Sequence, residues 1–281
     1  NTASFNGHFN NFQKIEKKLF TSSSEGLFEI ENYTLKKSNL SSGVPAKLIN
    51  YFTRDVENNL WFATDMGVYK KNSNSLLHFD NNSGLPHNYI YHIAVDKNNT
   101  TWIATQRGLA YIKNNKVYDF ENRIEKKWIY SDGLAQQIIT TQSIRKVVVD
   151  NNNIIWVGTW SGGLFRINNN AVYRFTQKDG LTDLSIRGIQ IDPQNNIWVS
   201  TRYGGVCKYD GKSFIAYSTK NGLKSNWVFS VETDYNQNLW FCTANGLTKH
   251  DGYKSVTYDA SNGINSAEII SSIKLEGKLW F

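Results

Sequence analysis

Aromatic, arginine and histidine side chains that could bind a ligand lie in short polar segments between the apolar runs of this sequence. The candidates are Arg107, Trp160, Arg202, Tyr203, His87, Tyr89, Trp128 and Trp227. An aromatic ring stacks on the apolar face of a sugar, and the planar fork of arginine binds a carboxylate or sulfate through two parallel hydrogen bonds. We therefore predict that these residues bind a small molecule or an oligosaccharide, with an acidic sugar as one option.

The same residues also have a purely structural explanation. In that interpretation Trp160 and Tyr203 pack against neighbouring elements, while Arg107 and Arg202 are solvated. Residue types alone do not separate the two explanations, because an aromatic side chain in a strand-rich protein serves packing as readily as binding.

Two histidines raise the alternative of catalysis. His92 lies in an apolar, strand-like run, and His87 follows a Gly-Leu-Pro segment. A histidine pair without a placed carboxylate does not make a catalytic site, and Cys207 and Cys242 have neither disulfide nor metal-ligand spacing. We predict that the chain is not an enzyme and has no catalytic residue, metal or cofactor; a lyase or hydrolase is the third function considered.

The segments that must position the candidates form an internal repeat. Tryptophan recurs about every 42 residues, with one longer interval between Trp102 and Trp156. Each internal unit has Asp six residues before its Trp, Thr three residues after it and Gly six residues after it; around Trp61 these are Asp55, Thr64 and Gly67. Such regular spacing indicates that one supersecondary unit is used again and again.

One unit predicts four strands joined by tight turns. In the unit around Trp102, strand-forming residues occupy about 89–95, 101–105, 109–112 and 117–120, with Asp, Asn and Gly between them. Four antiparallel strands, repeated around an axis, make a β-propeller, which solves the problem of exposed sheet edges. We therefore predict an all-β fold, a β-propeller of four-stranded antiparallel blades.

The string Asn59-Leu60-Trp61-Phe62-Ala63-Thr64-Asp65-Met66-Gly67-Val68 resembles the two-component regulator propeller repeat, and the strings that begin at Asn196 and Asn238 resemble it as well. The resemblance implies the periplasmic sensor region of a hybrid two-component regulator, a family that commonly senses polysaccharide fragments. It implies a periplasmic or extracellular location, with any kinase activity outside this chain. We predict a ligand-sensing domain; the alternative is a protein-interaction scaffold that uses the propeller rim.

The repeat predicts one propeller domain over residues 1–281 with seven blades. The predicted blades cover about residues 7–38, 46–80, 88–121, 142–176, 184–218, 225–259 and 266–281. The first unit has Phe20 in place of tryptophan, and the last one stops within its second strand, so its blade is incomplete. We therefore expect the chain to be a fragment of a longer receptor, which could be a homodimer.

The predicted binding face is where blades differ from one another. In a propeller, the turns between second and third strands share a face with the connections that lead into each first strand, and the candidates occupy these segments. The long interval before Trp156 adds residues around 121–130 and 135–141 beside one such connection. These additions indicate either a functional loop or a longer outer strand.

The charge and the hydropathy of the sequence limit the classes of partner that we expect. The formal net charge is +7, yet Lys and Arg are scattered along the chain. Because no basic stripe interleaves with aromatic residues, we predict no nucleic-acid partner. The sequence has no apolar run of 18 residues, so we expect membrane attachment only through segments outside this chain.

Overall fold

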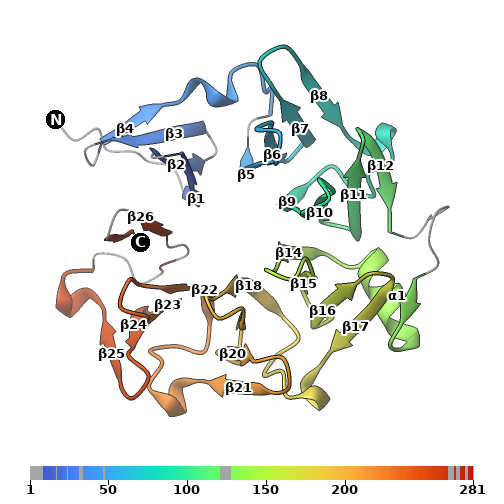
Figure 1. The fold of residues 1–281 in the computed structure, drawn as a ribbon. Helices are drawn as coiled ribbons and strands as arrows, with labels where there is room; N and C mark the ends of the chain where they lie inside the picture. The colour runs from blue at the N-terminus through green and yellow to red at the C-terminus, as the bar shows by residue number, and fades with distance from the viewer. Residues whose placement is uncertain are drawn as a thin grey trace. The chain divides into compact units, whose positions relative to one another are not determined.

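The computed structural model describes residues 9–16, 18–23, 25–31, 34–46, 48–120, 128–264, 269, 273–275 and 278–280. The chain forms two compact units, Asn1–Arg123 and Ile124–Phe281, called unit 1 and unit 2 below (Figure 1). Both consist of four-stranded antiparallel sheets in which strands pair in sequence order. The fold is an all-β propeller, as the repeat predicted.

Unit 1 contains three blades. Blade 1 consists of β1 (Phe9–Ile15), β2 (Lys18–Ser23), β3 (Gly26–Glu31) and β4 (Thr34–Lys37). Blade 2 consists of β5 (Ile49–Arg54), β6 (Leu60–Thr64), β7 (Gly67–Lys71) and β8 (Leu76–Phe79). Blade 3 consists of β9 (Ile90–Val95), β10 (Thr101–Thr105), β11 (Leu109–Lys113) and β12 (Lys116–Asp119).

Unit 2 contains three further blades. Blade 4 consists of β14 (Ile144–Val149), β15 (Ile155–Thr159), β16 (Leu164–Asn168) and β17 (Ala171–Phe175). Blade 5 consists of β18 (Ile186–Ile191), β19 (Ile197–Thr201), β20 (Val206–Tyr209) and β21 (Phe214–Tyr217). Blade 6 consists of β22 (Val228–Thr233), β23 (Leu239–Thr243), β24 (Gly246–His250) and β25 (Ser255–Tyr258). Short 3₁₀ turns follow most blades, at Asn39–Ser41, Asn81–Ser83, Gln177–Asp179, Thr219–Asn221 and Ala260–Asn262.

The prediction of seven blades is wrong: the described residues form six four-stranded blades. Beyond blade 6, the described residues form only β26 (Ile273–Leu275) and β27 (Lys278–Trp280), which make a two-stranded sheet. The repeat count included the frame around Trp280 because its motif matches. A motif that lies on a second strand carries no information about whether third and fourth strands pair with it.

The long interval between Trp102 and Trp156 forms two additional elements in unit 2. Strand β13 (Ile129–Tyr130) pairs in parallel with β17, at the outer edge of blade 4. Helix α1 (Gly133–Thr141) follows, and the Asp132 carboxylate caps its N-terminus by accepting hydrogen bonds from two backbone N–H groups. The segment thus provides a short extra outer strand and a helix that the repeat pattern did not predict.

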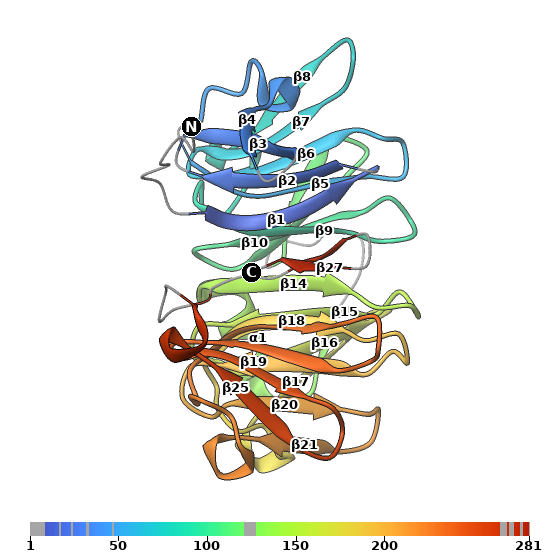
Figure 2. The same ribbon diagram turned by 90° about the vertical axis from the view of Figure 1, so that its left-hand side faces the viewer.

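Within each unit, apolar layers between successive blades hold the fold together. The first strands of adjacent blades contact each other, β5 with β9 in unit 1 and β14 with β18 in unit 2 (Figure 2). Ile90 and Ile93 on β9 are almost fully buried, and so are Ile186 and Ile189 on β18. These are equivalent positions of the repeat, so one sequence pattern builds each layer by removing apolar surface from water.

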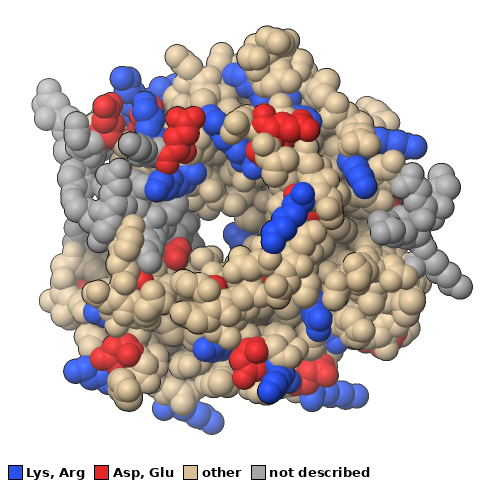
Figure 3. Space-filling view, in the orientation of Figure 1, with Lys and Arg blue, Asp and Glu red and all other residues tan. Residues whose placement is uncertain are grey.

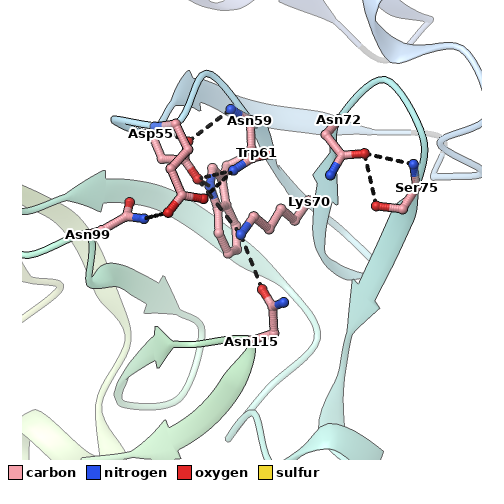
Figure 4. Close-up of polar contacts among 9 residues, drawn as sticks. Asp55, Asn59, Trp61, Lys70, Asn72, Ser75, Asn99 and Asn115 are labelled. Carbon is pink, nitrogen blue, oxygen red and sulfur yellow. Dashed lines mark hydrogen bonds and ion pairs between the residues drawn. The ribbon is translucent and has the colours of Figure 1, made fainter.

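A polar corner in five of the blades fixes the turn between first and second strands, and Figure 4 shows the one in blade 2. In blade 2, the Asp55 carboxylate accepts hydrogen bonds from the Asn59 backbone N–H at 2.9 Å and from Trp61 Nε1 at 2.8 Å. The corresponding Trp–Asp distances in blades 3, 4, 5 and 6 are 3.1, 3.0, 2.9 and 3.0 Å. We call each of these an Asp–Trp corner. The motif acid and the motif tryptophan therefore satisfy each other within every one of these blades.

Candidate functional site

Each first strand of blades 2–6 contains a β-bulge at one repeat position. The strand register shifts there, between Ile144 and Lys146 on β14 and between Ile186 and Gly188 on β18. The bulged residues of blades 2 to 6 are Asn50, Tyr91, Arg145, Arg187 and Phe229. A bulge redirects the side chain of the extra residue. Two successive blades of unit 2 therefore each present an arginine from the first strand.

The turn between second and third strands lies beside the start of the first strand in the same blade. One backbone hydrogen bond fixes this in each blade: Trp160 N–H donates to Ser143 at 2.9 Å, Arg202 N–H to Ser185 at 3.0 Å, and Ala244 N–H to Trp227 at 3.0 Å. The expected grouping of turns with the connections into first strands is thus present in blades 4, 5 and 6.

Further backbone bonds join neighbouring blades of unit 2 at this end. Gly163 N–H donates to the Leu184 carbonyl, and Gly205 N–H donates to the Asn226 carbonyl, both at 2.9 Å. The second bond holds the segment before β22 against the turn of blade 5. Trp227 of blade 6 is thereby positioned next to the blade 5 turn.

These constraints bring Arg145, Trp160, Arg187, Arg202 and Trp227 together; we call this group the Arg–Trp cluster. The guanidinium carbons of Arg145, Arg187 and Arg202 lie 4.1, 4.6 and 5.3 Å from the centre of the Trp160 ring. Arg187 and Arg202 also lie 5.6 and 5.0 Å from the centre of the Trp227 ring. Three cations thus share two indole rings, an arrangement in which each close pair is attractive.

The turns of blades 4 and 5 are one residue longer than those of blades 2, 3 and 6. In blade 2 the Thr64 hydroxyl donates to the carbonyl of Gly67, three residues later. In blades 4 and 5 the equivalent threonines donate to Gly163 and Gly205, four residues later. The glycine with positive φ is therefore the second of each Gly-Gly pair. The added residue enlarges the two turns that carry Trp160 and Arg202.

The cluster concentrates positive charge in a half-buried place. Burial, followed by the charges of Arg145 and Arg202, lowers the pKa of Arg187. All five residues of the cluster are partly shielded from solvent, whereas Tyr203, whose ring lies 5.1 Å from Arg202, is 64% exposed. On the face drawn in Figure 3, by contrast, basic and acidic side chains are mixed over both units.

Four of the eight predicted site residues lie together: Trp160, Arg202, Tyr203 and Trp227. Trp128 is also in unit 2, but it precedes β13 at the outer edge of blade 4, whereas Arg145 is on the innermost strand.

The other three predicted residues are in unit 1. The backbone N–H of Tyr89 donates to His87 Nδ1 at 2.9 Å, and Arg107 is exposed in the turn of blade 3. Their roles in binding, like that of Trp128, stay predictions.

Sequence reasoning missed Arg145 and Arg187. Both stand eleven residues before the motif tryptophan, at the variable position occupied by Asn50 in blade 2 and Tyr91 in blade 3. That variability was the available signal. Strict alternation along a strand does not predict a bulge, so neither side chain was expected beside the turns.

One of the two histidines considered for catalysis, His92, is packed inside unit 1. His92 is 5% exposed, and its ring centre lies 3.6 Å from that of Tyr51. Burial raises the pKa of Tyr51 to about 12, against a smaller opposite effect of a hydrogen bond with Gln13. Among the described residues, no group of three or more His, Cys, Asp or Glu side chains is arranged to hold a metal ion.

Comparison with known families agrees with the repeat described above. Residues 84–107 and 180–203 match the family model of the two component regulator propeller. Two segments of this chain thus match the two component regulator propeller repeat. The first matched segment leads into β9 and ends at the turn of blade 3, and the second leads into β18 and ends at Tyr203. Comparison with curated proteins yields no match.

Solved structures share the fold of these propeller repeats. The extracellular domain of a hybrid two component system from B. thetaiotaomicron is 23% identical, with a TM-score of 0.76, over 97% of this chain and 37% of its own. That of a second such system from the same organism is 18% identical, with a TM-score of 0.74, over 100% of this chain and 38% of its own. The chain therefore spans a little over a third of the length of either structure.

A virginiamycin B lyase from Staphylococcus aureus also has this fold. It is 13% identical, with a TM-score of 0.70, and the match covers 97% of this chain and 90% of the lyase. At such identity the likeness concerns the fold alone. Within the described part of the propeller repeats, no helix is long and apolar enough to cross a membrane.

Proposed function

We propose that this chain is an extracytoplasmic ligand-sensing propeller domain of a two-component signalling regulator, and that it recognises an oligosaccharide at the Arg–Trp cluster. The observation that carries the proposal is the meeting of Arg187, Arg202, Trp160 and Trp227 from three successive blades. The repeat family supports a sensor role, and the extracellular domains with the same fold support the location.

The chemistry of the cluster suits a sugar. Tyr203 is 64% exposed beside Arg202, so its ring is available to stack on a pyranose. Guanidinium groups donate hydrogen bonds to sugar hydroxyls as well as to charged substituents. The contributing turns belong to three blades, so a bound ligand would bridge blades 4, 5 and 6. A change in the contacts between these blades is the signal that we propose the domain transmits to the rest of a receptor.

Isothermal titration with neutral and acidic oligosaccharides, chosen from an array screen, tests this proposal. We expect at least one oligosaccharide to bind, and Tyr203→Ala to weaken that binding about tenfold, the effect of losing one stacking ring. Tyr253→Ala is the matched control, because Tyr253 is 98% exposed in the outer hairpin of blade 6. Failure of every oligosaccharide to bind the unmodified chain would overturn the proposal.

A further inference from the structure

Two arginines of the Arg–Trp cluster, Arg187 and Arg202, hold positive charge that no carboxylate among the described residues balances. Neither Arg187 nor Arg202 forms an ion pair or a side-chain hydrogen bond with any described residue, and the Nε–H of each is buried without an acceptor. The indole Nε1–H of Trp227 is likewise buried without an acceptor among the described residues. Buried N–H groups of folded proteins almost always have a partner, so several unmet donors in one place are unusual.

The acidic residue nearest to Arg187 in the sequence already accepts hydrogen bonds from the backbone. Asp183 lies in the connection before β18, and its carboxylate accepts hydrogen bonds from Ser185 N–H at 2.8 Å and Tyr203 N–H at 2.9 Å. It therefore holds the backbone of the blade 5 turn. Among the charged groups that influence the pKa of Arg187, Arg145 and Arg202 lower it and no carboxylate raises it.

One other arginine of unit 2, Arg174, is by contrast satisfied within the protein. Arg174 on β17 donates from Nε to the Gly162 carbonyl at 2.8 Å and lies 4.0 Å from the Asp132 carboxylate. Like charges that are held together lower the stability of a protein in its free state. A bound anion relieves this repulsion. The retained repulsion at Arg187 thus points to a binding role.

We infer that the Arg–Trp cluster is a binding site for an oxyanion, a sulfate or carboxylate group, with Arg187 and Arg202 as its principal donors. The inference rests on the proposed function in one respect, namely that the oxyanion is a substituent of the recognised oligosaccharide. Guanidinium groups bind oxyanions through paired, charge-assisted hydrogen bonds. The two indoles hold these groups in place before binding, which limits the side-chain entropy lost when the ligand is ordered.

Arg145 has a supporting role in this site. It comes from the bulge of β14, and its guanidinium carbon lies 4.1 Å from the centre of the Trp160 ring, the shortest such distance in the cluster. It therefore contributes long-range attraction for the anion and fixes the Trp160 ring between blades 4 and 5. Sulfate and carboxylate share the chemistry that the cluster recognises, so the experiment contains an arm for each.

The first measurement is the tryptophan fluorescence of the whole chain during titration with inorganic sulfate, against chloride at equal ionic strength. We expect a saturable change with sulfate that is lost in the variant Arg187→Gln/Arg202→Gln. Arg166→Gln is the matched control, because Arg166 also lies over an aromatic ring, Tyr173, but on β16. No saturable change, or the same change in the double variant, would overturn the inference.

The second measurement is isothermal titration with pairs of oligosaccharides that differ only in charge. One pair is an oligogalacturonate and its carboxyl-reduced form, and the other is a sulfated carrageenan disaccharide and its desulfated form. We expect the charged member of at least one pair to bind about tenfold to a hundredfold more tightly, the effect of one or two charge-assisted hydrogen bonds. Arg202→Lys, which keeps the charge but not the fork, should lose part of this preference.

The outcomes separate the inference from the proposed function. Equal binding of a charged sugar and its neutral partner would overturn the oxyanion site and leave oligosaccharide sensing intact. A specific sulfate response without binding of any oligosaccharide would support the site and overturn the proposed ligand class.

Discussion

The Asp–Trp corners and the Arg–Trp cluster use the same aromatic residue in opposite ways. In the corner of blade 5, the Trp198 edge donates to the Asp192 carboxylate at 2.9 Å, and both side chains are buried. In the cluster, guanidinium groups lie near the faces of Trp160 and Trp227, and the Nε–H of Arg187 finds no acceptor among the described residues. The hydrogen-bonding groups of the corner satisfy each other, whereas donors of the cluster lack an acceptor among the described residues.

The two sites also differ in how often they occur. The corner recurs in five blades with Trp–Asp distances between 2.8 and 3.1 Å, whereas the cluster combines residues that differ at equivalent positions of the repeat. A repeated and satisfied contact stabilises each blade. The cluster is not repeated, and donors of Arg187, Arg202 and Trp227 lack an acceptor among the described residues, which is the reason to assign it to binding.

We expect Asp192→Ala to cause the largest loss of stability, which would sharpen the contrast between the corners and the cluster. Its carboxylate accepts from the backbone N–H of Gln194 and Asn196 and from Trp198 Nε1. Their loss leaves buried donors unmet and should lower the free energy of unfolding by about 4 kcal/mol, measured by urea denaturation. Asp210→Ala, in an exposed turn of the same blade, is the control and should cost much less. Equal losses would show that the corners are not what stabilises a blade.

We expect a somewhat smaller loss of stability from Gly205→Ala, which lies in the blade 5 turn that carries Arg202 of the cluster. Gly205 has φ +80, and an added Cβ would lie 2.1 Å from the Tyr217 carbonyl oxygen. Relief of this clash must move the turn that carries Arg202, so we expect a loss of about 3 kcal/mol in unfolding free energy together with weaker ligand binding.

The control for that turn is Gly211→Ala. Gly211 has φ +98 and no atom within 4 Å of an added Cβ, so only backbone strain of about 1 kcal/mol is expected. If Gly205→Ala unfolded at the same urea concentration as Gly211→Ala, the close approach at the blade 5 turn would not constrain the cluster.

The smallest expected effect is on the pH dependence of stability, and it involves the Asp–Trp corner of blade 6 alone. Burial raises the pKa of Asp234, but hydrogen bonds from Trp240 and Asn238 outweigh it, so the pKa lies below its ordinary value of 3.8. The folded chain then binds this proton less readily than the unfolded chain, and stability falls as pH drops through and below that value. Asp234→Asn should make unfolding free energy less dependent on pH between about 5 and 2. An unchanged slope would exclude Asp234 as a source of acid sensitivity.

The sequence by itself determined the parts of this protein that depend on neighbouring residues. The acid six residues before each tryptophan, the threonine after it and the apolar pairs before it predicted four-stranded blades, because a tight turn and strand alternation are local properties. It also placed Trp160, Arg202, Tyr203 and Trp227 among the candidates, since they break the repeat.

Only the tertiary structure decided the blade count, the helix α1 and the membership of the cluster. Whether β26 and β27 acquire further strands depends on pairing, which a motif on one strand does not encode. Arg145 and Arg187 reach Trp160 because bulges redirect them and because blades 4 and 5 pack side by side. Those bulges arise from the register between strands, and the cluster from contacts between blades, so neither can be inferred from the order of residues along a single strand.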